Sequence, residues 1–188
     1  MVEELIKDWS RFDKLWDNAK SEIFRVQLLN EYNNQNQRKA FENYKKGIVE
    51  KEPEFEEWLN TVKTLTTKGV KIINLFVVDL PFSEYKIFAI EHYLFPTIKK
   101  GQVVMMVERN KLNQIVKGIE DFWMFDRKIA IPLVYDKKGE FLGLRREVIN
   151  KKIIEDFTRI EEALIKVAMP LQEFLEGKNI NLSNNSTI

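Results

Sequence analysis

The 188-residue chain contains no cysteine, a single histidine and no long apolar segment. Without cysteine, disulfides, thiolate metal sites and cysteine nucleophiles are all excluded. No run approaches the ~20 apolar residues that cross a bilayer, and the charged, amphipathic N-terminal stretch has no signal-peptide core. These absences predict a cytoplasmic protein without a membrane association.

The chain also has no excess charge of either sign, because 30 Lys and Arg stand against 29 Asp and Glu. No global field therefore favours nucleic acid, a membrane surface or an acidic ligand, and direct nucleic-acid binding is not expected. Hydrophobic residues at 44% and charged residues at 31% are ordinary for a globular protein. We expect one globular domain over residues 1–177 and a flexible, Asn- and Ser-rich tail over residues 178–188.

Several kinds of catalytic site lack their essential residues. A Ser-His-Asp arrangement would have to use His92, which lies within a predicted helix, and no Gly-x-Ser-x-Gly elbow is present. Metal binding needs clustered His, Cys or carboxylate ligands, and the sequence has one histidine and no cysteine. The pairs Lys68-Gly69 and Lys100-Gly101 resemble fragments of phosphate-binding loops, but neither stands in a Walker or Rossmann pattern. The pattern favours a non-enzymatic protein without deciding the question, and it predicts neither a cofactor nor a metal.

Residues 118–147 organise the predicted fold. Strands are predicted there over residues 121–126, 128–135 and 140–147. The first two are nearly continuous apolar runs, which is the pattern of strands covered on both faces. Between the last two, Asp136-Lys137-Lys138-Gly139 is typical of a hairpin turn, with Gly139 at positive φ.

The remaining apolar residues follow helical spacing or short strand-like runs. Helices are predicted over residues 3–19, 38–48, 53–68, 84–93 and 110–116, and strands over 22–29, 70–79 and 102–108. Residues 30–37 are polar and predicted to form a loop. A C-terminal helix should begin after Asn150 and end near Gly177, with a kink or break at Pro170.

This order of elements predicts an α/β fold. A strand that returns through a helix normally gives a parallel pair with a right-handed connection, and the later hairpins add antiparallel strands. We therefore expect a mixed sheet of about six strands with helices on both faces. The alternative is an α+β antiparallel sheet with helices on one side.

One acidic arrangement is a candidate catalytic site. Asp121 and Asp126 bracket a predicted strand and could flank a cleft together with Glu108, holding a divalent cation. Their odd separation places Asp121 and Asp126 on opposite faces of a regular strand, and aspartates at strand ends are commonly turn or cap residues. This spacing weakens the catalytic interpretation.

Five segments carry a family resemblance: FDKLWDNAKSEIFRVQ, FEEWLNTV, GVKIINLFVVDLPFSEYKIF, DFWMFD and YDKKGEFLG. With them the chain resembles a widespread family of uncharacterised proteins that is best represented in actinobacteria. Its members commonly neighbour helix-turn-helix regulators. The family carries arginines on the strand before the proline, where this chain has Asn74 and Phe76. The resemblance thus implies a shared fold and leaves a shared ligand open.

The element order and the FWMFD strand are also similar to one half of a phospholipase D-like domain. Active members of that family need a His-x-Lys-x4-Asp motif. If Asp126 takes the place of its aspartate, Ile119 stands at the histidine and Asp121 at the lysine. The resemblance therefore implies an inactive domain, and inactive domains of this kind serve as effector-sensing modules in some transcription regulators.

Together these observations predict a non-enzymatic regulatory or ligand-sensing domain. Its expected partners are a protein, such as a helix-turn-helix transcription regulator, and a small-molecule ligand. Arg25, Tyr32, Tyr85 and Arg109 are the candidate contact residues, because they are polar or amphipathic groups near strand ends and loops. The alternatives are a metal-dependent hydrolase or nuclease that uses the acidic residues, and a toxin–antitoxin or defence component.

Overall fold

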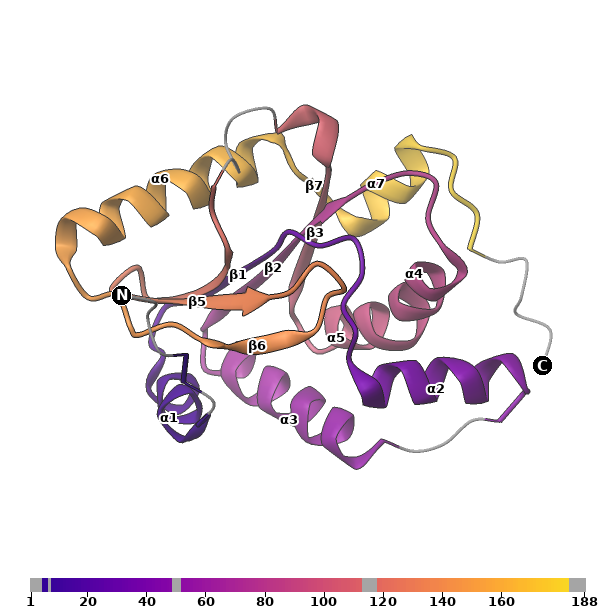
Figure 1. Cartoon of the computed structure of the whole chain (residues 1–188), viewed down its shortest axis with the longest axis horizontal. Helices are drawn as coiled ribbons and strands as arrows, with labels where there is room; N and C mark the ends of the chain where they lie inside the picture. The colour runs from indigo at the N-terminus through magenta and orange to yellow at the C-terminus, as the bar shows by residue number, and fades with distance from the viewer. Residues whose placement is uncertain (1–4, 7, 49–51, 113–117, 183–188) are drawn as a thin grey trace.

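The structure, a computed structural model, describes residues 5–6, 8–48, 52–112 and 118–182. In this part of the chain seven strands form one sheet in the order β6-β5-β4-β1-β2-β3-β7 (Figure 1). The strands are β1 (Glu22–Gln27), β2 (Lys71–Val78), β3 (Val103–Glu108), β4 (Asp121–Phe125), β5 (Ile129–Tyr135), β6 (Phe141–Leu144) and β7 (Met169–Pro170). Strands β1, β2 and β3 are parallel, and the other neighbouring pairs are antiparallel. The predicted mixed α/β sheet is confirmed, with seven strands in place of about six.

Helices cover both faces of this sheet, as predicted, and Figure 1 shows α6 and α3 on opposite sides of the strands. The α-helices are α1 (Ser10–Asn18), α2 (Gln35–Lys45), α3 (Pro53–Thr67), α4 (Glu84–Ala89), α5 (Phe95–Lys99), α6 (Lys151–Val167) and α7 (Leu171–Gly177). A π-helical turn, η1 (Ile90–Leu94), joins α4 to α5, and a 3-10 turn, η2 (Arg109–Lys111), follows β3. None of the helices in the described ranges has both the length and the apolarity that crossing a membrane requires.

Strand β4 is the centre of the core, and all five of its residues are buried. Its side chains alternate between the two faces of the sheet. The Phe122 ring lies 4.7 Å from the ring of Phe157 on α6, whereas the Trp123 ring lies 4.9 Å from Trp16 on α1. This confirms the prediction that the FWMFD run is a strand covered on both faces.

The structure corrects several predicted boundaries. Helix α1 begins at Ser10 instead of residue 3, because Ile6 pairs with Leu144 at the sheet edge and cannot be helical there. Helix α2 occupies residues 35–45 instead of 38–48, because the Asn34 side chain accepts the Gln37 backbone N–H and starts the helix early. The strands predicted over residues 22–29 and 140–147 are shorter, and they end at Gln27 and Leu144.

Pro170 breaks the C-terminal helix, as predicted, and the break creates an additional strand. Helix α6 ends at Val167, and Met169 and Pro170 then pair with Met106 and Met105 on the edge of β3 before α7 begins. Of the predicted tail, Ile180 and Leu182 pack against the cluster around α7, and residues 183–188 lie outside the described residues. Most of the helix predicted over residues 110–116 also lies outside them.

Asn150, the residue that caps the N-terminus of α6, gives a test of the local structure. Asn150 Oδ1 accepts hydrogen bonds from the backbone N–H groups of Lys152 at 3.1 Å and Ile153 at 3.3 Å. Asn150→Ala leaves both groups without this partner, so we expect the free energy of unfolding to fall by about 1 kcal/mol. Urea denaturation measures the loss. Asn150→Asp keeps the acceptor and serves as the control; equal losses in both variants would contradict the capping role.

Candidate ligand-binding cavity

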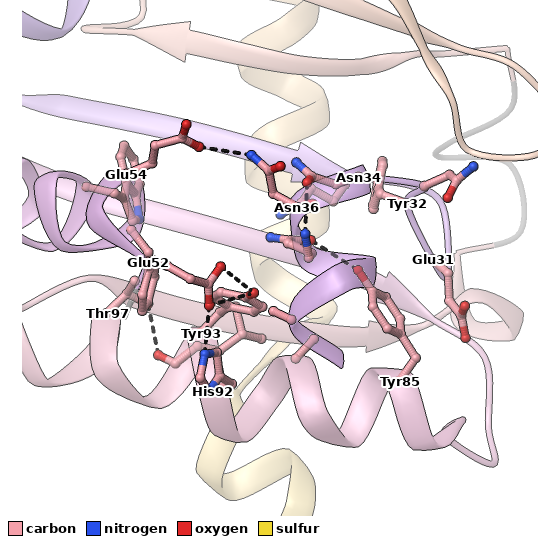
Figure 2. Close-up of a pocket in the computed structure, with 18 of the residues that line it drawn as sticks. Glu31, Tyr32, Asn34, Asn36, Glu52, Glu54, Tyr85, His92, Tyr93 and Thr97 are labelled. Atoms are coloured by element: carbon pink, nitrogen blue, oxygen red, sulfur yellow. Dashed lines mark hydrogen bonds and ion pairs between the residues drawn. The ribbon is translucent and has the colours of Figure 1, made fainter. Parts of the chain in front are cut away.

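A cavity of about 880 Å³ lies between one face of the sheet and the helices α2, α3 and α4. Figure 2 shows Tyr85, His92 and Tyr93 extending from α4 and η1 toward α2 and the start of α3. A volume of this size is within the range of small-molecule binding sites. The cavity is therefore the first place to look for a function.

The floor of the cavity is formed by side chains from neighbouring strands. Along β1, residues Ile23, Arg25 and Gln27 share one face, because side chains alternate on a strand. The strand register places Arg25 beside Asn74 of β2 on one side and Trp123 of β4 on the other. Polar groups thus occupy the middle of the sheet, where apolar side chains are the rule.

The polar floor is only partly satisfied by protein contacts. Gln27 Nε2 donates to Asn74 Oδ1 at 2.8 Å, and the Arg25 guanidinium lies 4.8 Å from the Trp123 ring centre. Within the described residues, Arg25 Nε and Gln102 Nε2 are buried without a hydrogen-bond partner. Gln102, which precedes β3, also lines the cavity and is only 3% exposed. Unpaired buried donors are costly, so they call for an explanation.

A buried lysine lines the same cavity. Lys86 of α4 is 5% exposed, and its Nζ lies 5.5 Å from the centre of the Phe76 ring on β2. Burial lowers the pKa of Lys86 to about 8, because it disfavours the charged form, and Glu31 opposes this shift from longer range. No hydrogen bond or ion pair to Lys86 Nζ is present among the described residues.

The carboxylate of Glu31 belongs to a polar cluster at the rim. The Ser83 hydroxyl donates to Glu31 Oε1, and Arg38 donates to Glu31 Oε2 at 3.0 Å. The Arg38 guanidinium also lies 3.9 Å from the centre of the Tyr85 ring. Burial alone would raise the pKa of Glu31, but the bonds from Ser83 and Arg38 outweigh it and hold the pKa below its usual value. Glu31 is therefore a fully partnered anion.

A second carboxylate, Glu52, is held at the start of α3. His92 Nε2 lies 2.8 Å from Glu52 Oε1, and the Tyr93 hydroxyl donates to Glu52 at 2.9 Å (Figure 2). His92 and Tyr93 reach the same carboxylate from adjacent positions of the π-helical turn η1. Such turns are rare and frequent at functional sites. The sequence predicts a satisfied, partly buried histidine, and the structure shows His92 with this partner.

Asp121 of β4 does not line the cavity itself, but it holds Tyr32, which does. The Tyr32 hydroxyl donates to Asp121 Oδ2, and the Leu28 backbone N–H donates to Asp121 Oδ1 at 2.9 Å. Burial raises the pKa of Asp121, and these hydrogen bonds only partly oppose it.

The Tyr32 segment also meets the β5–β6 turn, where Gly139 has the predicted positive φ of 79° and its carbonyl accepts the Asn33 N–H. A Cβ on Gly139 would lie 2.9 Å from the Glu31 carbonyl oxygen, so only glycine fits.

Three of the four predicted contact residues line the cavity: Arg25, Tyr32 and Tyr85. The fourth, Arg109, does not. Its Nε donates to Asp79 at 3.1 Å and its guanidinium donates to the Leu28 carbonyl at 2.7 Å, which fixes it beyond the ends of β1 and β2.

The three acids of the alternative site do not meet. Asp121 and Asp126 lie at opposite ends of β4, and Glu108 ends β3, where it pairs with Lys178 at 2.5 Å. Asp126 accepts the backbone N–H groups of residues 20–22 at 2.7–3.1 Å, and these bonds outweigh burial and lower its pKa. Over the described residues, no three His, Cys, Asp or Glu side chains are grouped as a metal site would require.

Lys86, Asn74 and Gln102 are cavity residues that the sequence reasoning did not select. A signal for Asn74 is present, since it is a polar residue inside the apolar run of β2. Lys86 carries no such signal, because a lysine on a short helix is ordinarily solvated. Gln102 directly precedes β3 in the sequence, and only the structure shows that its side chain lines the cavity.

The fold is similar to that of a phospholipase D family member, Nuc from Salmonella typhimurium, with a TM-score of 0.50. The two share 10% identity over 86% of this chain and 90% of that one. The predicted likeness to a phospholipase D-like domain is thus confirmed for the fold alone. TrmBL2, an archaeal chromatin protein whose structure shows a novel mode of DNA binding, aligns with a TM-score of 0.48 and 10% identity, over 87% of this chain and 51% of that one.

No curated protein matches the chain by sequence. A family model does match it, over residues 10–176, which include the whole sheet and every residue of the cavity floor. That family is described as a domain of unknown function, DUF6879. The chain with this polar cavity over its sheet therefore belongs to the DUF6879 family.

Proposed function

We propose that this protein is a ligand-sensing domain that binds a small organic molecule in the cavity between the sheet and α2, α3 and α4. The observation that carries the proposal is the polar floor. Arg25, Gln27 and Asn74 occupy the centre of the sheet under a space large enough for a metabolite.

Stability alone does not account for this arrangement. Buried polar groups without full hydrogen bonding destabilise a fold, and departures from ordinary core chemistry cluster at functional sites. Here Arg25 Nε and Gln102 Nε2 lack partners, although the same face of the sheet is apolar where α1 and α3 cover it. A bound molecule would supply the missing acceptors.

The proposal includes a protein partner that responds to ligand binding. The transcription regulator expected from the family resemblance remains a prediction, as does the cytoplasmic location. The hydrolase or nuclease alternative gains no support from the geometry, because Glu108, Asp121 and Asp126 lie apart.

A cavity-filling variant tests the proposal. Ala40 of α2 is half-buried and lines the cavity, so Ala40→Trp should occupy the space that a ligand needs. In a thermal-shift screen of a diverse metabolite panel, a ligand at 100 times its Kd should stabilise the wild type by about 2.7 kcal/mol. We expect Ala40→Trp to lose this response.

Thr61→Trp is the matched control, because Thr61 lies on the exposed face of α3 and outside the cavity lining. It should keep the full response to the same compound. A ligand that stabilises all three proteins equally would bind elsewhere and would contradict the proposed site.

A further inference from the structure

We propose that the cavity recognises an anionic ligand, a carboxylate or a phosphate, through donors of its lining that lack a carboxylate partner: Arg25, Lys86 and Gln102. This inference rests on the proposed function and adds the chemical class of the ligand. It follows from the balance of partnered and unpartnered groups in the cavity lining.

Each carboxylate that lines the cavity already has a protein partner. Glu31 is held by Ser83 and Arg38, Glu52 by His92 and Tyr93, and Glu54 accepts the Asn36 side-chain amide at 3.0 Å. These acids therefore have little remaining capacity to attract a cationic ligand.

The cations of the lining, the half-buried Arg25 and the buried Lys86, are not balanced in the same way. Arg25 contacts the ring of Trp123 and interacts with the Tyr135 hydroxyl; burial raises the pKa of Tyr135, and the charge of Arg25 and a hydrogen bond with it partly oppose this shift. The nearby carboxylate of Asp121 is occupied by Tyr32 and the Leu28 N–H. Lys86 contacts the Phe76 ring, and no carboxylate of the described chain is hydrogen-bonded to it. Within the described residues neither cation forms an ion pair, although Asp121 acts on Arg25 and Glu31 acts on Lys86 from longer range.

Amide groups add uncharged donors to this part of the cavity. Among the described residues, Gln102 Nε2 is buried without a partner. Beside Arg25, the Asn74 side-chain oxygen accepts a hydrogen bond from Gln27, so the part of the Asn74 amide that remains for a ligand is its NH₂ group. Carboxylate and phosphate oxygens match such donors, and hydrogen bonds to charged groups are about twice as strong as neutral ones. The floor and Lys86 of α4 thus present several donors and two positive charges to the cavity.

The remainder of the ligand meets rings. The aromatic side chains that line the cavity walls include Tyr44, Phe55, Trp58, Tyr93, Tyr135 and Phe141. They favour a planar or apolar body on the molecule that carries the anion. The inferred ligand class is therefore a small organic acid or organic phosphate with a ring.

Three simple compounds test this inference: benzoate, phenyl phosphate and the neutral benzamide. Binding is followed by tryptophan fluorescence and by ligand-observed NMR, since Trp58 and Trp123 line the cavity. We expect benzoate or phenyl phosphate to bind the wild type at least about 10-fold more tightly than benzamide, which is the effect of one charge-assisted hydrogen bond. The tighter of the two anions distinguishes a carboxylate ligand from a phosphate ligand.

Arg25→Met and Lys86→Met remove the charge and keep an unbranched side chain, which is close in length to lysine and shorter than arginine. Each should weaken the binding of the anion by about 10-fold or more and leave the binding of benzamide unchanged, whereas Arg25→Lys should retain part of the preference. Lys128→Met removes an exposed cation at the β4–β5 turn and should change nothing. Thermal unfolding of each variant verifies that it is folded.

Two results would overturn the inference. Benzamide could bind as tightly as the anions, or the anions could bind the charge-removing variants as well as the wild type. In either case, a binding signal that Ala40→Trp abolishes would still support the ligand-sensing function, and only the anion site would be rejected. Absence of binding by all three compounds would also overturn the anion site, and the metabolite screen would decide the wider proposal separately.

Discussion

Lys86→Met should make the protein more stable at neutral pH, by about 3 kcal/mol. The folded structure keeps the Lys86 ammonium in a buried place, which lowers its pKa from 10.5 to about 8. Each pKa unit of this shift means that folding disfavours the charged form of Lys86 by about 1.4 kcal/mol. Methionine fills a similar space and carries no charge, so it avoids this cost. A residue that destabilises the empty fold while serving a ligand is the expected compromise at a binding site.

The pH dependence identifies the cause of this gain. Between about pH 8 and 10.5 the unfolded chain binds a proton at Lys86 that the folded chain does not, so wild-type stability contains a contribution that rises with pH. The advantage of Lys86→Met should therefore be full below pH 8 and disappear toward pH 10.5. Chemical denaturation across this range measures the difference between the two proteins. A difference that is constant with pH, or one that Lys128→Met reproduces, would show that desolvation of Lys86 is not the cause.

Glu161→Gln should abolish a loss of stability that the wild type shows between about pH 4.5 and 7. Glu161 of α6 is fully buried, its Oε1 accepts a hydrogen bond from Arg127 at 3.1 Å, and its Oε2 has no partner in the described chain. Burial and the neighbouring Glu22 carboxylate raise the pKa of Glu161 to about 7. The folded protein thus holds a proton there that the unfolded chain releases near pH 4.5, and stability falls as pH rises through this window.

Glutamine imitates the protonated acid, so the variant should equal the wild type near pH 4.5 and exceed it above pH 7. Glu162→Gln is the matched control, because Glu162 is exposed and also pairs with Arg127, at 3.0 Å. Urea midpoints at a series of pH values give the two curves. Parallel curves for the wild type and Glu161→Gln would exclude this carboxyl as the source of the pH dependence.

The elements with continuous or periodic apolar patterns could be predicted from the sequence. Strand β4 was predictable because Phe122–Phe125 are apolar without interruption, and Asn150 because a cap residue precedes a clear helical face. Strand β7 was not, since Met169 and Pro170 form a strand only because the edge of β3 is open to them. The start of α1 depends in the same way on the pairing of Ile6 with Leu144, which is a distant contact.

The candidate site divides along similar lines. Arg25 could be selected from the sequence, because a charged residue in the middle of a strand-like segment departs from the pattern around it. Lys86 could not, because its burial results from the packing of α4 against Phe76 on another element. Arg109 was selected because it follows the end of a predicted strand, and only the structure shows that it pairs with Asp79 and the Leu28 carbonyl instead of lining the cavity.

The position of β1 constrains how the chain can be assembled or divided. This early strand lies between β2 and β4, so one of its edges remains empty until residues 121–125 have been synthesised. A fragment that stops before β4 would present that bare edge to other molecules, together with the uncovered ring of Phe24. Cleavage between β1 and β4 is therefore expected to yield two fragments with exposed strand edges and apolar surface instead of two smaller domains. Truncated forms of this protein are expected to aggregate.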